Sequence, residues 1–242
     1  MSHRESAIRI LTVCFVLCLL GCVGSMAFLG MRVPETTNDK DPGVLPAVKR
    51  FSLQTGDILC RPNLSWLPGS SDVPCGRNFG HVVIVVKGAE DSTIEATLNK
   101  AVVCEAVVFD QTTRSLIRNP DDQVRETTAG VSFGKRFEGI RYRLRMNLPE
   151  RQKVMLVSYL YKQLDQSHYD LFGPKAESGS YLIPGKMHGE PEQVNWNCAT
   201  FAWNSFAFST GIDLDANGGR WVYPNDIIRC RQFDQPEGRI RF

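Results

Sequence analysis

The sequence lacks the residue clusters that several common functions require. Lysines and arginines are mostly interspersed with acidic residues, and the net charge is only +2. The one locally basic segment, residues 134–145, alternates with period two, which favours a strand with one solvated face over a nucleic-acid-binding surface. No cysteine or histidine spacing is typical of a zinc site, and no repeat or low-complexity segment occurs. We therefore expect no nucleic-acid partner, no metal and no other cofactor.

The first 32 residues have the pattern of a targeting segment. Arg4 and Arg9 precede a nearly unbroken apolar run over residues 10–31. In one interpretation, Leu19-Leu20-Gly21-Cys22 resembles a bacterial lipobox and Cys22 becomes a lipidated N-terminus. In the other, the run is an uncleaved membrane-spanning helix, for which about 20 apolar residues suffice.

Both interpretations predict a membrane-anchored protein that faces the periplasm or the cell exterior, because the arginines are retained in the cytoplasm. Residues 33–50 are polar, contain proline and have no periodicity, so we expect a tether. Residues 51–242 then suffice for one domain with a sizeable core.

The cysteines indicate at least one free thiol in this domain. Beyond the targeting segment the chain has an odd number of them, which cannot all pair in an oxidising compartment. They are Cys60, Cys75, Cys104, Cys198 and Cys230. Cys60 and Cys75 flank a loop rich in Pro, Gly and Ser, and a disulfide between them is one possible pairing.

Strand patterns dominate the first part of the domain and helix patterns the last. Residues 81–87 and 101–109 are almost continuous runs of apolar β-forming residues, with a short helix expected between them from residue 94. Strands are also expected at 114–118 and 142–146. A helix is expected from Glu150 to about residue 165, and another from Cys198 to about Thr210, ending at Gly211. This order predicts an α+β fold.

Cys198 is the candidate nucleophile. It follows Asn197 and opens an apolar helical run, and a helix N-terminus favours the thiolate form. A buried structural cysteine is the ordinary alternative. The polar residues before it and the backbone N–H groups of the helix start, which can hold an oxyanion, favour the catalytic interpretation.

A thiol nucleophile needs a base, and the domain offers three histidines. His81 opens the apolar strand at 81–87, which would hold its imidazole rigidly. His168 comes at a helix end, where capping would explain it, and His188 comes in a loop rich in Gly, Pro and Glu. We therefore expect His81 to be the base.

Glu105 is the candidate third residue. A carboxylate within a continuous apolar strand is costly unless it has a partner, and an imidazole on a neighbouring strand would be one. The alternative is a glutamate on the exposed face of an edge strand. Glu95 is a rival, although its segment has the pattern of an amphipathic helix, where glutamate is ordinary.

Several short motifs together resemble the permuted NlpC-type papain-like hydrolases, and most closely the YiiX/YaeF-like bacterial proteins. They are Gly56-Asp57-Ile58-Leu59, Gly80-His81-Val82, a Glu-Ala pair, Asn197-Cys198, Gly211-Ile212-Asp213-Leu214 and Tyr223-Pro224-Asn225-Asp226. The Asn-Cys pair is also similar to that of the lecithin retinol acyltransferase-like branch.

The resemblance covers about residues 53–228 and implies a circularly permuted papain-like α+β fold, with an antiparallel sheet packed against helices. It also implies Cys198 as nucleophile, His81 as base and Glu105 as the residue that orients it. Because the Glu-Ala pair occurs at both Glu95 and Glu105, the third position stays open.

Two classes of function follow. In the first, we expect a membrane-tethered cysteine hydrolase that cleaves an amide or ester bond, in a peptide, a peptidoglycan stem or a lipid, through an acyl-thioester on Cys198. Alternatively, it is a non-catalytic module that binds a lipid or a peptide on the same fold. Two loops that are apolar for loops, at residues 64–68 and 181–184, would line an acyl-chain pocket or cover the core.

Overall fold

The computed structural model describes residues 12–20, 50–62, 79–110, 112–113, 115–133, 141–164, 167–170, 195–215 and 222–242. Residues 12–20 are helical, with exposed apolar side chains. No helix within the described ranges combines the length and the apolar character needed to cross a membrane. Cys22, residues 33–49 and both apolar loops lie outside these ranges, so the predictions made for them stay predictions.

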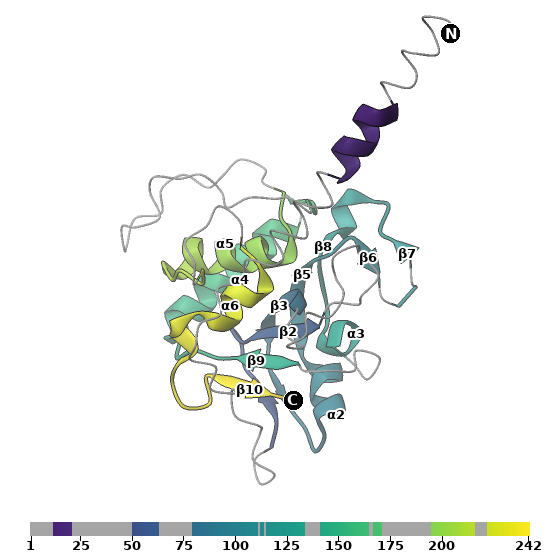
Figure 1. Ribbon diagram of the computed structural model, residues 1–242. Coiled ribbons are helices and arrows are strands. Elements are labelled where there is room, and N and C mark those ends of the chain that lie inside the picture. Colours follow the sequence, from purple (N-terminus) through teal and green to yellow (C-terminus); the bar gives the residue numbers. More distant parts are fainter. Residues whose placement is uncertain are drawn as a thin grey trace, which may run out of the picture. The chain divides into compact units, whose positions relative to one another are not determined.

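An antiparallel sheet forms the centre of the domain (Figure 1). Among the described residues it has six strands in the order β10-β9-β2-β3-β5-β8. Their bounds are β2 Ile58–Pro62, β3 Phe79–Lys87, β5 Val102–Ala106, β8 Val124–Thr128, β9 Tyr142–Leu144 and β10 Arg239–Arg241. The long apolar strand predicted from residue 81 is β3, which lies in the middle of this sheet.

Two pairs of short strands lie outside this sheet. Strand β1 (Ser52–Leu53) pairs with β4 (Ala89–Glu90), and β6 (Phe109–Asp110) pairs with β7 (Ser115–Leu116). The expected strand over 101–109 therefore ends at Ala106, and the one over 114–118 is reduced to β7.

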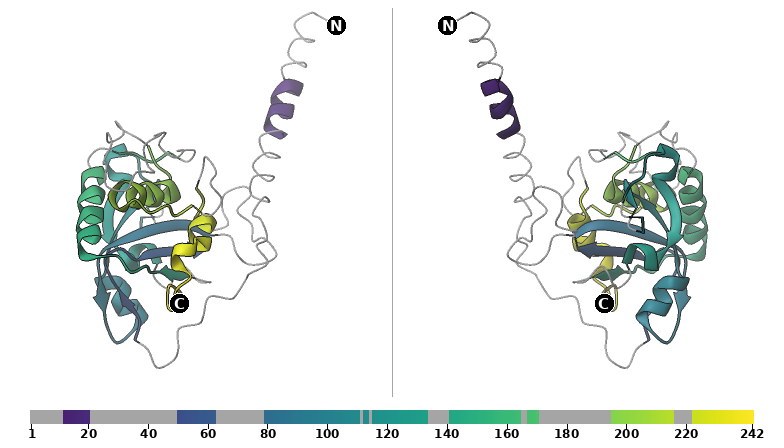
Figure 2. Two further views of the ribbon diagram at one scale, coloured as in Figure 1. Left: turned by 90° about the vertical axis from the view of Figure 1, so that its left-hand side faces the viewer. Right: turned by 90° about the vertical axis from the view of Figure 1, so that its right-hand side faces the viewer.

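Helices cover both faces of the central sheet (Figure 1 and Figure 2). They are α2 Ile94–Lys100, α3 Ala129–Phe133, α4 Glu150–Leu164, α5 Cys198–Thr210 and α6 Pro224–Arg229, with 3-10 turns η1 Pro120–Asp122 and η2 Arg231–Phe233. Thr93 is the N-cap of helix α2, and its hydroxyl accepts from the amide of Ala96. Gly211 is the C-cap of helix α5, and its φ of 73° is left-handed and suits glycine.

Side chains alternate along the strands and build two apolar clusters. Val82 and Ile84 of β3 pack with residues of α4 and α5 in one cluster. Val83 and Val85 pack with residues of α2 and α3 in the other. The predicted α+β fold, an antiparallel sheet packed against helices, is confirmed at this level.

Candidate active site

His81 lies near the start of β3, directly opposite Arg61 of β2. It has the same parity as Val83 and Val85, which contribute to the α2/α3 cluster, so its side chain belongs to that face of the sheet. Its ring stacks on Phe133 of α3 with centroids 6.4 Å apart. His81 is 5% exposed, so its imidazole is held inside the domain.

Glu105 lies on β5, the next strand of the sheet. The register pairs Ile84 with Cys104, and continuing it places Glu105 opposite Val83, diagonal to His81. Long side chains reach across such a diagonal. His81 Nε2 and Glu105 Oε2 are 2.8 Å apart.

The structure contradicts the alternative that Glu105 lies on an exposed edge strand. Strand β5 is covered by β8 on its outer side, and Glu105 is 1% exposed. Its rival, Glu95, lies on the partly exposed side of α2, as the helical pattern predicted.

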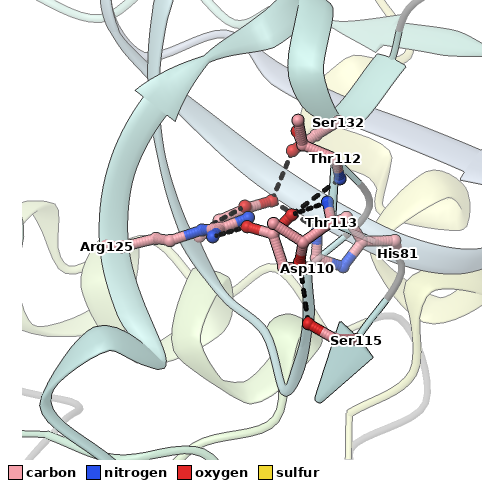
Figure 3. Close-up of polar contacts among 8 residues, drawn as sticks. His81, Asp110, Thr112, Thr113, Ser115, Arg125 and Ser132 are labelled. Atoms are coloured by element: carbon pink, nitrogen blue, oxygen red, sulfur yellow. Dashed lines mark hydrogen bonds and ion pairs between the residues drawn. The ribbon is translucent and has the colours of Figure 1, made fainter. Parts of the chain in front are cut away.

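Two further residues hold the Glu105 carboxylate (Figure 3). Ser132 Oγ donates to Oε2 at 2.6 Å, and Arg125 Nε donates to Oε1 at 3.0 Å. Burial alone would raise the pKa of Glu105, but the hydrogen bond and charge of His81, the charge of Arg125 and the bond from Ser132 lower it to about 2. The carboxylate is therefore ionised at neutral pH.

Cys198 is the first residue of α5. The Asn197 side chain caps this helix by accepting from the amides of Ala199 and Thr200, both at 2.9 Å, and the Thr200 hydroxyl accepts from the Asn197 amide. This capping box fixes where the helix begins, and hence where the sulfur lies. The cap uses the amides of Ala199 and Thr200, which were expected from the sequence to be available for an oxyanion. The amide of Cys198 is not part of the cap.

The sulfur lies against the start of β3. It is 4.0 Å from the carbonyl oxygen of Gly80, and the backbone of Val82 helps to lower the pKa of the thiol. These two residues flank His81 in the chain. The fold thus brings together the thiol and the imidazole that the sequence predicted as a pair.

The protonation of Cys198 and His81 is linked. Burial raises the pKa of the Cys198 thiol, but the hydrogen bond and charge of His81 outweigh it and the pKa is lowered. Burial and the charge of Arg61 lower the pKa of His81, but its bonds to Cys198 and Glu105 raise it above the ordinary value. Opposite shifts of this kind favour a thiolate–imidazolium pair.

Three other described cysteines of the domain have no such partner. Cys60, Cys104 and Cys230 are free thiols, and burial raises the pKa of each, that of Cys104 to about 12. Cys75, the possible disulfide partner of Cys60, lies outside the described residues, so that pairing stays a prediction.

The other candidate bases are placed differently. The His168 side chain is 33% exposed and its Nδ1 lies 4.0 Å from Asp121. His188 lies outside the described residues. In the described portion of the chain, no group of three or more His, Cys, Asp and Glu could hold a metal ion.

Sequence reasoning missed several residues of this site. Arg125 and Ser132 contact Glu105 from β8 and α3. Arg61 is buried opposite His81. Burial raises the pKa of the Tyr169 phenol, and the charge of the nearby Cys198 thiolate raises it further. Only the buried carboxylate at 105 signalled that cationic or hydrogen-bonding partners must exist.

Comparisons with known proteins give limited similarity. No family model matches the chain. A stretch of 31 residues is 52% identical to the uncharacterized protein YycO of Bacillus subtilis, and it spans 13% of this chain and 13% of YycO. The crystal structure of YiiX from Escherichia coli O157:H7, described as a metalloprotein, superposes with a TM-score of 0.44 at 14% identity, covering 74% of this chain and 94% of YiiX. Similarity of this size assigns neither a family nor an activity.

Proposed function

We propose that this protein is a cysteine hydrolase with a circularly permuted papain-like, NlpC-type fold. The observation that carries the proposal is the constellation of Cys198 at a helix start, His81 against its sulfur, and Glu105 bonded to the far nitrogen of the imidazole at 2.8 Å. A thiol, a base and a group that orients the base are the parts that acyl transfer requires. The base comes before the nucleophile in the chain, the reverse of the order in papain, hence the permutation.

The geometry supports a two-step reaction. The Cys198 thiolate attacks a carbonyl carbon, and the His81 imidazolium gives its proton to the departing nitrogen or oxygen as that bond breaks, leaving an acyl-thioester. His81 then takes a proton from water, the resulting hydroxide attacks the thioester, and the carbon–sulfur bond breaks to release an acid and restore the thiolate.

Glu105 determines which nitrogen of His81 takes part in these proton transfers. Because His81 Nε2 bonds to the carboxylate, Nδ1 is the nitrogen left for the sulfur and the leaving group. An ionised Glu105 also stabilises the imidazolium that each step forms or consumes. It orients the base without taking the proton itself.

The proposed substrate is an amide or ester in a peptide, a peptidoglycan stem or a lipid. The test incubates the purified protein with peptidoglycan and, separately, with phospholipid vesicles, and analyses products and protein by mass spectrometry. An acyl mass on Cys198 that hydroxylamine removes, together with released product, supports hydrolysis. Cys198→Ala is the matched control and should give neither.

A binding module on the same fold is the second candidate, and one observation favours it. Cys198 is only 8% exposed, so a substrate carbonyl must reach a largely covered sulfur. Ligand retention without product, equal in the wild type and in Cys198→Ala, would select this function and reject the hydrolase.

We also propose that the N-terminal segment anchors the domain to a membrane, facing away from the cytoplasm. Cys22→Ala separates the two anchoring modes. Release of that variant from the membrane fraction identifies lipidation, which needs more than one acyl chain for firm anchoring. Unchanged attachment identifies an uncleaved helix, and recovery of the wild type in the soluble cytoplasmic fraction rejects both.

A further inference from the structure

The Glu105 carboxylate is fixed from the side opposite His81 by Arg125. The register of β5 and β8 places Arg125 directly opposite Glu105, so the two side chains are immediate cross-strand neighbours. Arg125 Nε donates to Oε1 at 3.0 Å, whereas His81 and Ser132 contact Oε2. Each carboxylate oxygen thus has its own partners, and the group has little freedom to rotate.

Arg125 is itself held at its outer end. Its NH1 nitrogen donates to Asp110 Oδ2 at 2.6 Å, while the other oxygen of Asp110 accepts from the amides of Thr112 and Thr113 at 2.6 and 2.8 Å. In Figure 3, Arg125 lies to the left and His81 to the right of the polar network, with Asp110, Thr112 and Thr113 beside it. The β6–β7 turn is therefore connected to the imidazole by a continuous chain of polar contacts.

The outer part of this network lies at a pocket of about 370 Å³, lined by Asp110, Arg125 and residues of β7 and η1. Arg125 keeps 20% of its side chain exposed there. The inner end of the same network at Glu105 is fully enclosed. Arg125 thus spans from a solvent-facing turn to the buried carboxylate, which a shorter side chain could not do while bonding to both acids.

We propose that Arg125 is a positioning residue that fixes the Glu105 carboxylate toward His81, with Asp110 as its outer anchor. The inference rests on the proposed function, because it takes the Cys198–His81 pair to be the reacting pair. In this role Arg125 acts on the reacting pair through Glu105.

A positioning role and a purely electrostatic role differ in what the charge alone can restore. Loss of a nearby positive charge disfavours the thiolate, so a purely electrostatic role would also shift the acid limb to higher pH, and Arg125→Lys, which keeps the charge, would then restore the wild-type profile. If Arg125 positions Glu105, its loss lets the carboxylate turn away from His81, and thiol reactivity is lost at higher pH.

The experiment measures the rate at which iodoacetamide alkylates Cys198 in the purified full-length protein as a function of pH, by mass spectrometry of the Cys198 peptide. Arg125→Met should lower the rate at pH 7 about tenfold, with the acid limb of the profile shifted up by about one pH unit. Arg125→Lys keeps the charge but cannot bond to both acids, and should restore only a small part of the rate.

Asp110→Asn keeps Arg125 and alters only the exposed end of the network, so the fold should tolerate it even if Arg125→Met does not fold. It should shift the acid limb in the same direction by a smaller amount. Arg118→Met is the matched control: Arg118 is an exposed arginine that lines the same pocket, and its loss should leave the profile unchanged.

The outcomes separate this inference from the proposed function. A wild-type thiol with an ordinary pH profile would defeat the proposed function, whatever the variants do. If the wild-type Cys198 is reactive, three results would each overturn the positioning role alone. The acid limb of the profile is unchanged in both Asp110→Asn and Arg125→Met, or it moves to lower pH in either variant. Alternatively, Arg125→Lys has the full wild-type profile.

Discussion

Two buried carboxylates, Asp57 and Glu105, differ in the partners that compensate their charge. Both are 1% exposed. Asp57 accepts two hydrogen bonds from Arg145, at 2.7 and 2.6 Å, and one from the amide of Gln54 at 2.8 Å. Glu105 shares its oxygens among Arg125, Ser132 and a histidine.

The difference lies in what each partner can do. An arginine and a backbone amide never change protonation at working pH, so the Asp57 site is a fixed ion pair that joins the turn before β2 to the segment after β9. An imidazole does change protonation, so the Glu105 site is coupled to a proton transfer. A buried carboxylate therefore becomes a candidate for function when one of its partners titrates.

The largest expected effect comes from removing that titrating partner. In His81→Ala, burial of Cys198 is no longer offset, its pKa rises, and alkylation by iodoacetamide at pH 7 should fall by about a hundredfold or more. His168→Ala, which removes a more exposed imidazole, is the control and should react like the wild type. Full reactivity in His81→Ala would rule His81 out as the base.

The next largest effect concerns the fixed ion pair. Asp57→Asn leaves Arg145 without its carboxylate in a mostly buried site, which should lower the free energy of unfolding by about 3 kcal/mol. Urea denaturation measures this loss. At a temperature where the variant is folded, its Cys198 should react at the wild-type rate. A folded variant with a slow thiol would mean that Asp57 acts on the site as well.

The sequence predicted those parts of the site that depend on a single element. The apolar run of β3, the Asn197 cap and the Gly211 stop of α5 are local signals, and they placed His81 at a strand start and Cys198 at a helix start. Glu105 stood out because a charge within an apolar strand requires a partner.

The other contacts depend on register and could not be predicted locally. Strand β8 has no strong apolar pattern, so neither its existence nor the cross-strand pair of Arg125 with Glu105 was visible. Ser132 belongs to a five-residue helix that no capping signal marked. Asp57 and Arg145 also meet only through strand order, because β2 and β9 are neighbours in the sheet but distant in sequence.

A smaller effect is expected from Glu105→Gln. The amide keeps the shape but presents a neutral group to His81, so its orientation and its imidazolium are less stabilised. Alkylation of Cys198 at pH 7 should fall about a hundredfold at most, while the protein stays folded. Glu95→Gln, on the partly exposed side of α2, should have no effect. Loss of reactivity in Glu95→Gln alone would exchange the roles of the two glutamates.

The smallest expected effect is the change in the alkylation rate of Cys198 when the pH of the wild-type protein is lowered. An ordinary thiol loses about tenfold in thiolate for each pH unit below its pKa. Because the pKa of Cys198 is lowered and that of His81 raised, an ion pair persists in the pH range between the two pKa values, and the alkylation rate should change little with pH across that range. The rate should fall only when the pH passes below the lowered pKa of the thiol.

The two carboxylates sharpen this last prediction. Asp57→Asn should keep the flat profile, because its partners do not titrate with the thiol. Glu105→Gln should make the profile steeper, because the imidazolium loses its counter-charge and the thiolate becomes less favoured. Cys104, whose pKa burial raises to about 12, serves as the internal reference in the same samples and should remain unlabelled throughout. A Cys198 rate that falls tenfold for each pH unit below the ordinary pKa of a thiol in the wild type would show that Cys198 and His81 do not form an ion pair, and that His81–Glu105 is, like Asp57–Arg145, a structural contact.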